Sequence, residues 1–280
     1  MKTVIEVIQA TTAYFQKNGV ESPRLNIEHL LAHVLGKKRM ELYLEFDRPL
    51  NDQELAPLRD LVKRRAQREP LQHLLGTVEF AGKTFVSDKR ALIPRPETEQ
   101  LCELILADLR ERNTSPKRVL DVGTGSGVIA ATLALALPDA AVGAVDVSAD
   151  ALALAQENIS RHLLQDRLHL RASDLFSDVE GTYDLVVANL PYIDTAEVAA
   201  LAPEVRCDPV LALDGGVAGL EIFRRFVPEA RQHLRGRLAL EFGHDQAEAL
   251  RALLAEHNYH DIRVLSDYQG RQRFVFATYG

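Results

Sequence analysis

Cysteine and long apolar runs are both scarce in this chain of 280 residues. Its two cysteines, Cys102 and Cys207, stand in no metal-ligand or redox spacing, which suits a reducing compartment. The most apolar run, residues 128–137, is too short to cross a bilayer and ends at Pro138. The opening residues hold no apolar stretch typical of a targeting segment. We therefore expect a cytoplasmic protein without a membrane span.

An excess of positive charge is also missing, because 33 Lys and Arg face 40 Asp and Glu, giving a net charge of −7. Broad binding to a phosphate backbone needs clustered basic residues, so nucleic acid is disfavoured as the primary substrate. The cluster of Lys63, Arg64, Arg65 and Arg68 allows two interpretations, a partner patch or a solvated helix face. We favour the solvated face.

Two common kinds of catalytic site lack their sequence signals. The nine histidines include no His-x-x-x-His pair with a third ligand nearby, so we expect no metal. Ser126 lacks the Gly-x-Ser-x-Gly spacing of a nucleophile elbow, which disfavours hydrolase chemistry. The length and the 46% hydrophobic content suffice for one α/β core with a smaller appended domain.

The N-terminal part of the chain has the pattern of a small helical bundle. Apolar residues recur there at spacings of three and four over about residues 4–67. Turn-forming residues separate the expected helices, and Ser22 and Asn51 are the expected N-caps of two of them.

Strands and helices alternate in the rest of the chain. Residues 77–86 predict a β-hairpin, and a helix is expected over about 97–112. The loop before Gly219 is rich in Pro, Asp and Gly. The alternation predicts an α/β fold with a doubly wound, mainly parallel sheet and an antiparallel closing pair at one edge. The expected strands are 119–122, 141–146, 168–172, 185–188, 237–242, 262–265 and 273–277, and the expected helices are 128–137, 149–161, 220–234 and 245–257.

A glycine-rich loop follows the first strand of this series and opens the next helix. Glycines there let the backbone turn tightly, and amide groups at the helix start face a ligand. A dinucleotide fingerprint would need Gly-x-Gly-x-x-Gly, but the third glycine arrives one position early and Val128 takes its place. NAD is therefore the weaker prediction, and S-adenosylmethionine the stronger. Asp121 is expected to orient the methionine amino group, beside the loop of Gly123, Thr124, Gly125, Ser126 and Gly127.

Two further acidic residues follow strands where the adenosine half of the cofactor is expected. Asp146 ends the second strand, where its carboxylate can accept hydrogen bonds from both ribose hydroxyls. A helix cap is its structural alternative. Asp174 follows the third strand and could meet the adenine amino group, with Leu175 and Phe176 walling the ring. Ordinary turn chemistry explains Asp174 equally well.

The fourth strand is followed by Asn189-Leu190-Pro191-Tyr192. An amide nitrogen is a poor nucleophile and must be held and polarised. The Asn189 side-chain oxygen and the Leu190 carbonyl can accept its two N–H groups, and Tyr192 can pack on the planar amide. Pro191 restricts the loop. Glu241, which ends a later strand, is either catalytic or a hydrogen-bonding residue of the sheet.

With these motifs the chain resembles the bacterial release-factor glutamine methyltransferases, which methylate the glutamine of the Gly-Gly-Gln loop in class I peptide chain release factors. The resemblance implies a seven-stranded class I methyltransferase fold and S-adenosylmethionine as methyl donor, with no metal. It implies that the helical domain contacts the release factor, and that Arg95 to Thr98, including Glu97, help line a substrate pocket between domains. The motifs are Glu69-Pro70-Leu71-Gln72 with Gly76, residues 92–99, residues 121–127, residues 189–192, residues 213–216 with Gly219-Leu220, and Glu241-Phe242-Gly243.

We accordingly expect a helical recognition domain over 1–75, a hairpin and linker over 76–95, and a catalytic domain over 96–280. The chain departs from the family's Asn-Pro-Pro-Tyr at Leu190. A backbone carbonyl remains there, so the expected hydrogen bond survives. The alternatives are an adenine amino methyltransferase acting on nucleic acid, a glutamine methyltransferase for another protein, and a cofactor-binding regulator without catalysis.

Overall fold

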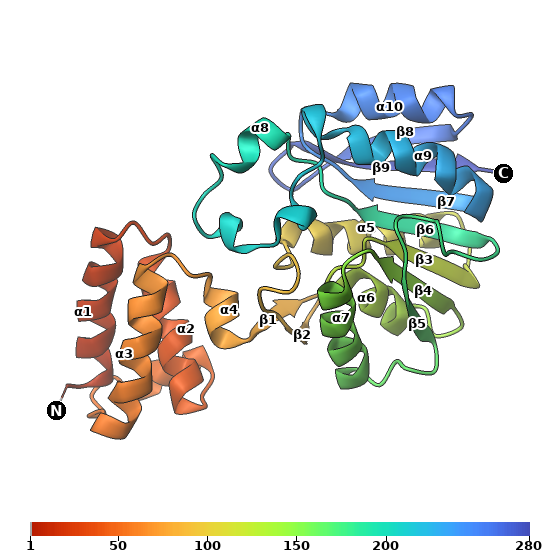
Figure 1. The fold of residues 1–280 in the computed structure, drawn as a ribbon. Coiled ribbons are helices and arrows are strands. Elements are labelled where there is room, and N and C mark those ends of the chain that lie inside the picture. The colour runs from red at the N-terminus through yellow and green to blue at the C-terminus, as the bar shows by residue number, and fades with distance from the viewer. Residues whose placement is uncertain (1) are drawn as a thin grey trace. The chain divides into compact units, whose positions relative to one another are not determined.

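The computed structural model describes residues 2–280, which form two compact units (Figure 1). One unit runs to Thr77 and also includes Ala202–Cys207, and the other comprises Val78–Leu201 and Asp208–Gly280. We call the first the helical unit and the second the sheet unit. Within residues 2–280, no helix combines the length and apolarity needed to cross a membrane.

The helical unit is the predicted bundle. Its helices bury one apolar face each, so that Val4, Phe15, Ile27 and Leu31 share a core and are 0% exposed. The elements are α1 (Val4–Lys17), α2 (Pro23–Leu35), the 3₁₀ helix η1 (Arg39–Leu44), α3 (Asp52–Ala66) and α4 (Leu71–Leu75).

One of the two predicted caps in this unit is confirmed and the other is wrong. Asn51 accepts a hydrogen bond from the Glu54 backbone, and the Glu54 side chain binds back to the Asn51 N–H. Ser22 instead has a left-handed backbone with φ of 47° and makes no side-chain capping bond. Pro23 follows it at the start of α2 and has no N–H to satisfy, which lowers the need for a cap.

The short segment Ala202–Cys207 joins the helical unit through one acidic side chain. Glu204 accepts a hydrogen bond from Arg65 Nη2 at 3.0 Å and one from Arg68 Nη2 at 2.6 Å. Arg65 also donates to the Asn26 side chain at 2.7 Å. Arg64 pairs with Glu69 at 2.6 Å. Three members of the basic cluster in α3 and its following turn therefore have ion-pair partners, rather than forming a purely solvated face.

The sheet unit contains the predicted doubly wound sheet. The strand order is β5-β4-β3-β6-β7-β9-β8. Neighbouring strands run parallel except at β9, which pairs antiparallel with both β7 and β8, so the predicted antiparallel pair at one edge is confirmed. The strands are β3 (Arg118–Val122), β4 (Ala141–Asp146), β5 (Leu168–Ala172), β6 (Tyr183–Asn189), β7 (Leu234–Glu241), β8 (His260–Ser266) and β9 (Gln272–Tyr279), and the predicted hairpin is β1 (Thr77–Phe80) with β2 (Lys83–Val86).

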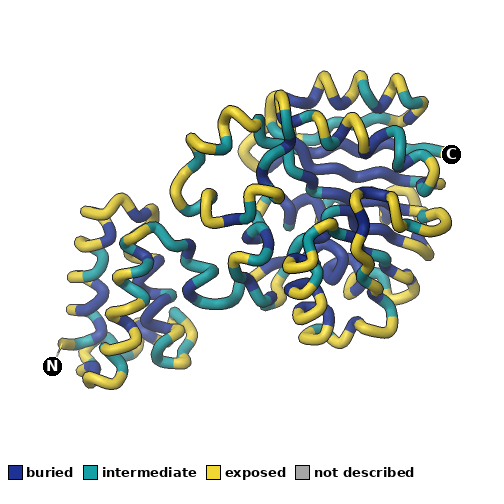
Figure 2. The backbone as a smooth tube through the Cα atoms, in the orientation of Figure 1, coloured by how far each residue is buried: buried dark blue, intermediate teal, exposed yellow. Residues whose placement is uncertain are grey.

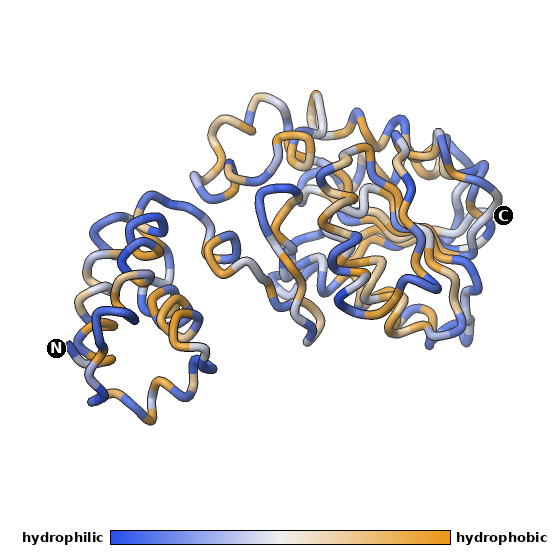
Figure 3. The backbone as a smooth tube through the Cα atoms, turned by 60° about the horizontal axis from the view of Figure 1, so that its bottom comes forward, coloured by the Kyte–Doolittle hydropathy of each residue, from blue (hydrophilic) through white to orange (hydrophobic). Residues whose placement is uncertain are grey.

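Helices cover both faces of this sheet. Side chains of α5, α6 and α7 pack with one face, and those of α9 and α10 pack with the other. The central strands β3, β6 and β7 are accordingly mostly buried in Figure 2, whereas the edge strands β5 and β8 are partly exposed. The middle of the sheet is predominantly hydrophobic in Figure 3. The loop before α9 contains short helices that the sequence did not predict. The elements are α5 (Pro96–Glu111), α6 (Val128–Ala136), α7 (Ala149–Arg161), α8 (Thr195–Val198), η2 (Val205–Cys207), η3 (Val210–Ala212), η4 (Val217–Gly219), α9 (Glu221–His233) and α10 (Ala247–Glu256).

Candidate active site

The strand register brings the sequence-predicted residues into one row along the carboxyl edge of the sheet. Val122 of β3 pairs with Val145 of β4 and with Ala188 of β6, so the next residue, Gly123, lies beside both Asp146 and Asn189. In turn, Asn189 pairs with Glu241 of β7. Ligands of open α/β sheets bind at this edge, where the strand order reverses.

The glycine loop has the backbone that its sequence requires. Gly123, Gly125 and Gly127 have φ of 72°, 56° and 80°, a region that favours glycine. A Cβ on Gly127 would come within 3.1 Å of the Ala155 Cβ, so glycine there also allows α6 and α7 to approach. The loop leads directly into α6, whose first-turn amides are the expected ligand donors.

Asp146 is placed to receive a ligand from the end of β4. Its Oδ2 accepts a hydrogen bond from the Gly125 N–H at 2.8 Å, and its Oδ1 accepts one from the Ser148 N–H at 2.9 Å. Ser148, not Asp146, is the side-chain cap of α7. Burial raises the pKa of Asp146, although these backbone donors oppose the shift. Each carboxylate oxygen has a second lone pair, so Asp146 can still accept from two hydroxyls.

Asp121 lies beneath the loop and is fully buried. Its Oδ2 accepts hydrogen bonds from the Thr124 hydroxyl at 2.6 Å and from the Ala130 N–H at 3.2 Å. Among residues 2–280, its Oδ1 has no hydrogen-bond partner. Burial raises the pKa of Asp121 to about 7. An unpaired buried carboxylate oxygen is costly, so this atom is a candidate acceptor for a cationic ligand group.

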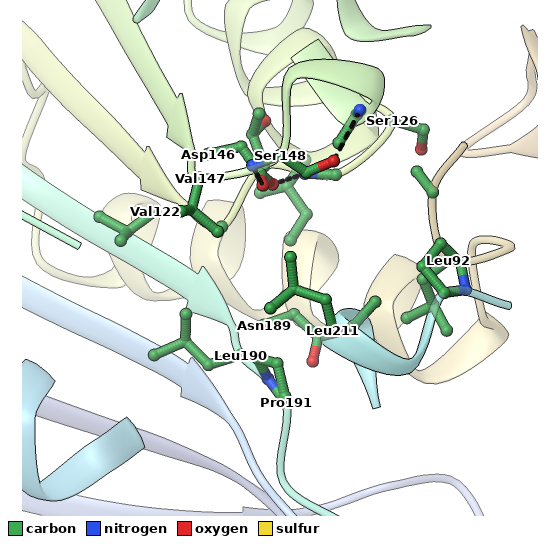
Figure 4. A pocket seen from close by; sticks show the side chains of 18 of the residues that line it. Leu92, Val122, Ser126, Asp146, Val147, Ser148, Asn189, Leu190, Pro191 and Leu211 are labelled. Carbon is green, nitrogen blue, oxygen red and sulfur yellow. Dashed lines mark hydrogen bonds between the residues drawn. The ribbon is translucent and has the colours of Figure 1, made fainter. Parts of the chain in front are cut away.

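A pocket opens above this row of residues (Figure 4). Asp174 and Leu175 line it, whereas Phe176 packs in the core against Phe226 at a ring distance of 5.1 Å. The expectation that Phe176 walls a ligand ring is therefore wrong, because its side chain points into the core. Asp174 also pairs with Arg225 at 2.8 Å. The lining comprises Arg90–Leu92, Pro94, Thr98, Val122–Ser126, Val128, Ile129, Asp146–Ser148, Ala151, Ser173–Leu175, Asn189–Pro191, Pro209, Leu211, Ala212 and Ile222.

The predicted acceptor motif divides between the pocket and the protein interior. Asn189, Leu190 and Pro191 line the pocket (Figure 4). Tyr192 lies outside this lining and directs its hydroxyl to Glu241 Oε1 at 3.3 Å. Its backbone carbonyl accepts a hydrogen bond from Gln246 Nε2 at 2.8 Å. The turn after Asn189 is thus held from both its side chain and its main chain.

The segment before α5 contributes different residues from those expected. Pro94 and Thr98 line the pocket, whereas Arg95 and Glu97 lie outside this lining. Arg95 instead pairs with Asp208 at 2.5 Å, and Asp208 also accepts a hydrogen bond from the Ile93 N–H. Burial raises the pKa of Asp208, while the Arg95 charge opposes this. Arg95 therefore holds the loop around Asp208.

Several lining residues had no sequence signal of their own. Arg90 and Ala91 follow the hairpin, and Pro209, Leu211 and Ala212 belong to the long loop before α9. Their contribution depends on where two loops fold back over the sheet edge. Within residues 2–280, no three His, Cys, Asp or Glu side chains gather as metal ligands.

Comparison with known proteins agrees with this architecture. Residues 6–76 match the family model of the PrmC N-terminal domain, and residues 96–205 match that of the methyltransferase small domain. A release factor glutamine methyltransferase of Geobacter sulfurreducens is 44% identical over 99% of this chain and 97% of its own length. The chain belongs to the release factor glutamine methyltransferase family. A second member, from Chlorobaculum tepidum, is 42% identical over 97% of this chain and 95% of its own length.

The fold likeness extends further than the sequence likeness. The catalytic domain of hMettl16, solved in complex with MAT2A 3'UTR hairpin 6, matches with a TM-score of 0.60. It is 17% identical, and the match covers 79% of this chain and 82% of that one. This confirms the class I methyltransferase fold of the sheet unit. The methyltransferase domain implies S-adenosylmethionine as the methyl donor.

Proposed function

We propose that this enzyme methylates the side-chain amide nitrogen of a glutamine in peptide chain release factors. The finer expectation is that the factors are of class I and that the glutamine is the one in their Gly-Gly-Gln loop. Relatives of 44% and 42% identity over nearly the whole chain carry the name release factor glutamine methyltransferase. The observation that carries the proposal is the position of Asn189, at the pocket and directly beside Gly123.

The cofactor half of the pocket has the groups that S-adenosylmethionine needs. When bound, that molecule supplies a methyl group on a positively charged sulfur. The proposed contacts are Asp146 for the ribose hydroxyls, Leu175 with Asp174 for adenine, and the loop of Gly123 to Gly127 for the amino acid portion. The unpartnered Oδ1 of Asp121 is the proposed acceptor for the amino group.

The acceptor half must hold a planar amide. Asn189 and the Leu190 carbonyl are the proposed acceptors for its two N–H groups, so that the nitrogen lone pair faces the cofactor side. Pro191 lines the pocket beside them, and Tyr192 supports the turn from within the protein. We assign the acceptor contacts to Asn189, Leu190 and Pro191. Tyr192, which was expected to pack on the acceptor amide, is assigned to support of the turn, because its hydroxyl binds Glu241. Arg95 is assigned to loop support because it pairs with Asp208.

The leucine that replaces the family's first proline should change rigidity more than chemistry. Leu190 is 3% exposed, and its Cδ2 lies 3.0 Å from the place where a Cβ on Gly123 would stand. The side chain is thus confined by packing. Loss of a proline in a compatible loop costs about 0.4–1 kcal/mol, which is too little to abolish transfer.

The direct test uses the full-length protein, S-adenosylmethionine and a folded class I release factor. Mass spectrometry of the product should find one added methyl group on the glutamine of the Gly-Gly-Gln loop. A factor in which that glutamine is replaced by glutamate is the matched control and should stay unmodified. A short peptide containing Gly-Gly-Gln should react far more slowly, because binding energy remote from the reacting atom is lost.

Two outcomes would contradict the proposal. Transfer to adenine in DNA without transfer to the release factor would favour the adenine amino methyltransferase. A cell lysate incubated with labelled cofactor could reveal transfer to a glutamine of a different protein. The enzyme would then still be a glutamine methyltransferase, but its substrate would not be a release factor.

A further inference from the structure

Behind the acceptor turn, a buried chain of hydrogen bonds links three distant parts of the sequence. Asn189 Nδ2 donates to Thr98 Oγ1 at 2.9 Å, and Thr98 Oγ1 donates to Glu241 Oε2 at 2.8 Å. The other carboxylate oxygen of Glu241 accepts from the Tyr192 hydroxyl at 3.3 Å. Thr98 is 3% exposed and Glu241 is 1% exposed, so water does not substitute readily for these partners.

The donor and acceptor in each of these hydrogen bonds follow from the number of hydrogens that each group carries. An ionised carboxylate only accepts hydrogen bonds, so Thr98 must donate its single hydroxyl hydrogen to Glu241. Its oxygen can then only accept from Asn189, which requires the NH₂ end of the Asn189 amide to face Thr98. The oxygen end of the same amide is thereby turned away from Thr98.

The opposite orientation of Asn189 would have nearly the same shape but the wrong polarity. Its NH₂ group would then meet the N–H groups of the acceptor amide, and two donors cannot bind each other. Shape alone discriminates poorly between the two ends of an asparagine amide, since they are nearly isosteric. A polar partner with a fixed direction is needed to select one of them.

We propose that Thr98 and Glu241 are positioning residues that fix the Asn189 side chain with its oxygen toward the acceptor amide. This inference rests on the proposed function, because it assumes an acceptor that presents N–H groups. Neither residue needs to touch the acceptor for this role. Tyr192 shares Glu241 as its hydrogen-bond acceptor, so the same carboxylate orders both side chains of the acceptor turn.

The charge state of Glu241 decides whether the direction is fixed. The titratable and charged groups that face it are Glu97 and Cys102 of α5, Tyr192, and Arg273 of β9. Burial raises the pKa of Glu241 to about 7, and its bonds to Thr98 and Tyr192 oppose the shift. A protonated Glu241 could donate to Thr98, whose own hydrogen would then be free to turn to Asn189. Turnover should therefore rise with pH through this region.

The decisive variants are Thr98→Val, which removes the hydroxyl at nearly constant shape, and Thr98→Ser, which restores it. In the full-length protein, Thr98→Val should lower kcat by about 10- to 100-fold, as expected for a misplaced reacting group. The KM for folded release factor and the calorimetric affinity for S-adenosylhomocysteine should stay within about threefold of wild type, because the change acts on orientation rather than on binding. Thr98→Ser should recover most of the turnover.

A matched control and a pH profile separate positioning from simple support of the fold. Thr132 of α6 is 9% exposed and lies outside the pocket lining, so Thr132→Val should leave kcat near wild type. Glu241→Gln cannot ionise, so its kcat should be reduced above neutral pH and should lose the rise seen in the wild-type profile. An unchanged kcat in Thr98→Val overturns the inference. The inference is also overturned if Thr98→Val loses turnover because it unfolds and Thr98→Ser does not recover the turnover.

A second readout does not depend on turnover. The Asn189 side-chain NH₂ resonances, assigned by their absence in Asn189→Asp, should show hydrogen-exchange protection in wild type and in Thr98→Ser. Thr98→Val should lose that protection. One outcome is that wild type fails to methylate the release factor while the amide is protected in wild type and Thr98→Ser but not in Thr98→Val. The proposed function then fails and the positioning role of Thr98 stands. If wild type methylates the factor and the protection is the same in all three proteins, the positioning role fails and the proposed function stands.

Discussion

Gly219 offers a sharp test of how the acceptor turn is held. It has φ of 64° in the turn before α9, and a Cβ added there would overlap the Tyr192 carbonyl oxygen and press on the Gln246 side chain. Gln246 Nε2 donates to that carbonyl at 2.8 Å and to the Ala218 carbonyl at 2.9 Å. Gly219→Ala must therefore move the main chain of the acceptor turn or break these bonds.

The expected cost is the sum of two effects that a control can separate. An alanine forced into the left-handed region costs about 1–2 kcal/mol. Loss of two hydrogen bonds adds about 1 kcal/mol each. Gly270 has φ of 83° in the turn between β8 and β9, and nothing lies within 4 Å of its added Cβ. Gly270→Ala should therefore show the backbone cost alone.

The assay is urea unfolding of both full-length variants, followed by turnover on folded release factor. Gly219→Ala should lose about 2 kcal/mol more unfolding free energy than Gly270→Ala, since only it breaks the Gln246 bonds. Its kcat should also fall while Gly270→Ala keeps the wild-type value. Equal stability and equal turnover in the two variants would refute the view that Gly219 makes room for the Tyr192 carbonyl.

Three further predictions address the cofactor, the acceptor and pH. Asp146→Ala should weaken S-adenosylmethionine binding by about 1–3 kcal/mol in calorimetry, whereas Asp150→Asn, an exposed change in the first turn of α7, should not. Asn189→Ala should lower methyl transfer by about two orders of magnitude or more, with cofactor affinity much less affected; near-normal turnover would exclude its role. Unfolding free energy should fall as pH rises from about 4.5 to about 7, because the unfolded chain ionises Glu241 near its ordinary 4.5 and the fold keeps the proton to about 7. In Glu241→Gln the same pH scan should be flatter by an amount on the order of 3 kcal/mol, and an unchanged slope would contradict the buried-acid assignment.

The parts of the fold that depend on local pattern could be predicted from the sequence. Strands buried on both faces appear as apolar runs, so β3, β4 and β6 were located within two residues of their ends. Asp146 and Asn189 were predicted because each directly follows such a strand, and parallel strands end at a common edge. For these residues, the end of a strand followed by a polar side chain was sufficient to predict a place at the site.

Contacts between distant segments could not be predicted in this way. Thr98 and Glu241 touch because α5 packs against the end of β7, which no local signal in either segment indicates. Phe176 was expected to wall the ligand ring, but the turn places Leu175 at the pocket and the next residue, Phe176, in the core. Ser22 has the residue type of a cap, yet its backbone is left-handed and its side chain makes no capping bond.

The attachment of Glu204 to Arg65 and Arg68 has a consequence for how this family can be re-engineered or recombined. The helical unit is encoded in two pieces, and the second piece, Ala202–Cys207, lies inside the stretch that encodes the sheet unit. A chimaera that exchanges only the first 77 residues with a relative would leave Glu204 facing unfamiliar partners. A buried or half-buried carboxylate without its arginines is destabilising. Successful exchange of the helical unit should therefore require position 204 to travel with positions 65 and 68, and these three positions should change together wherever family members differ.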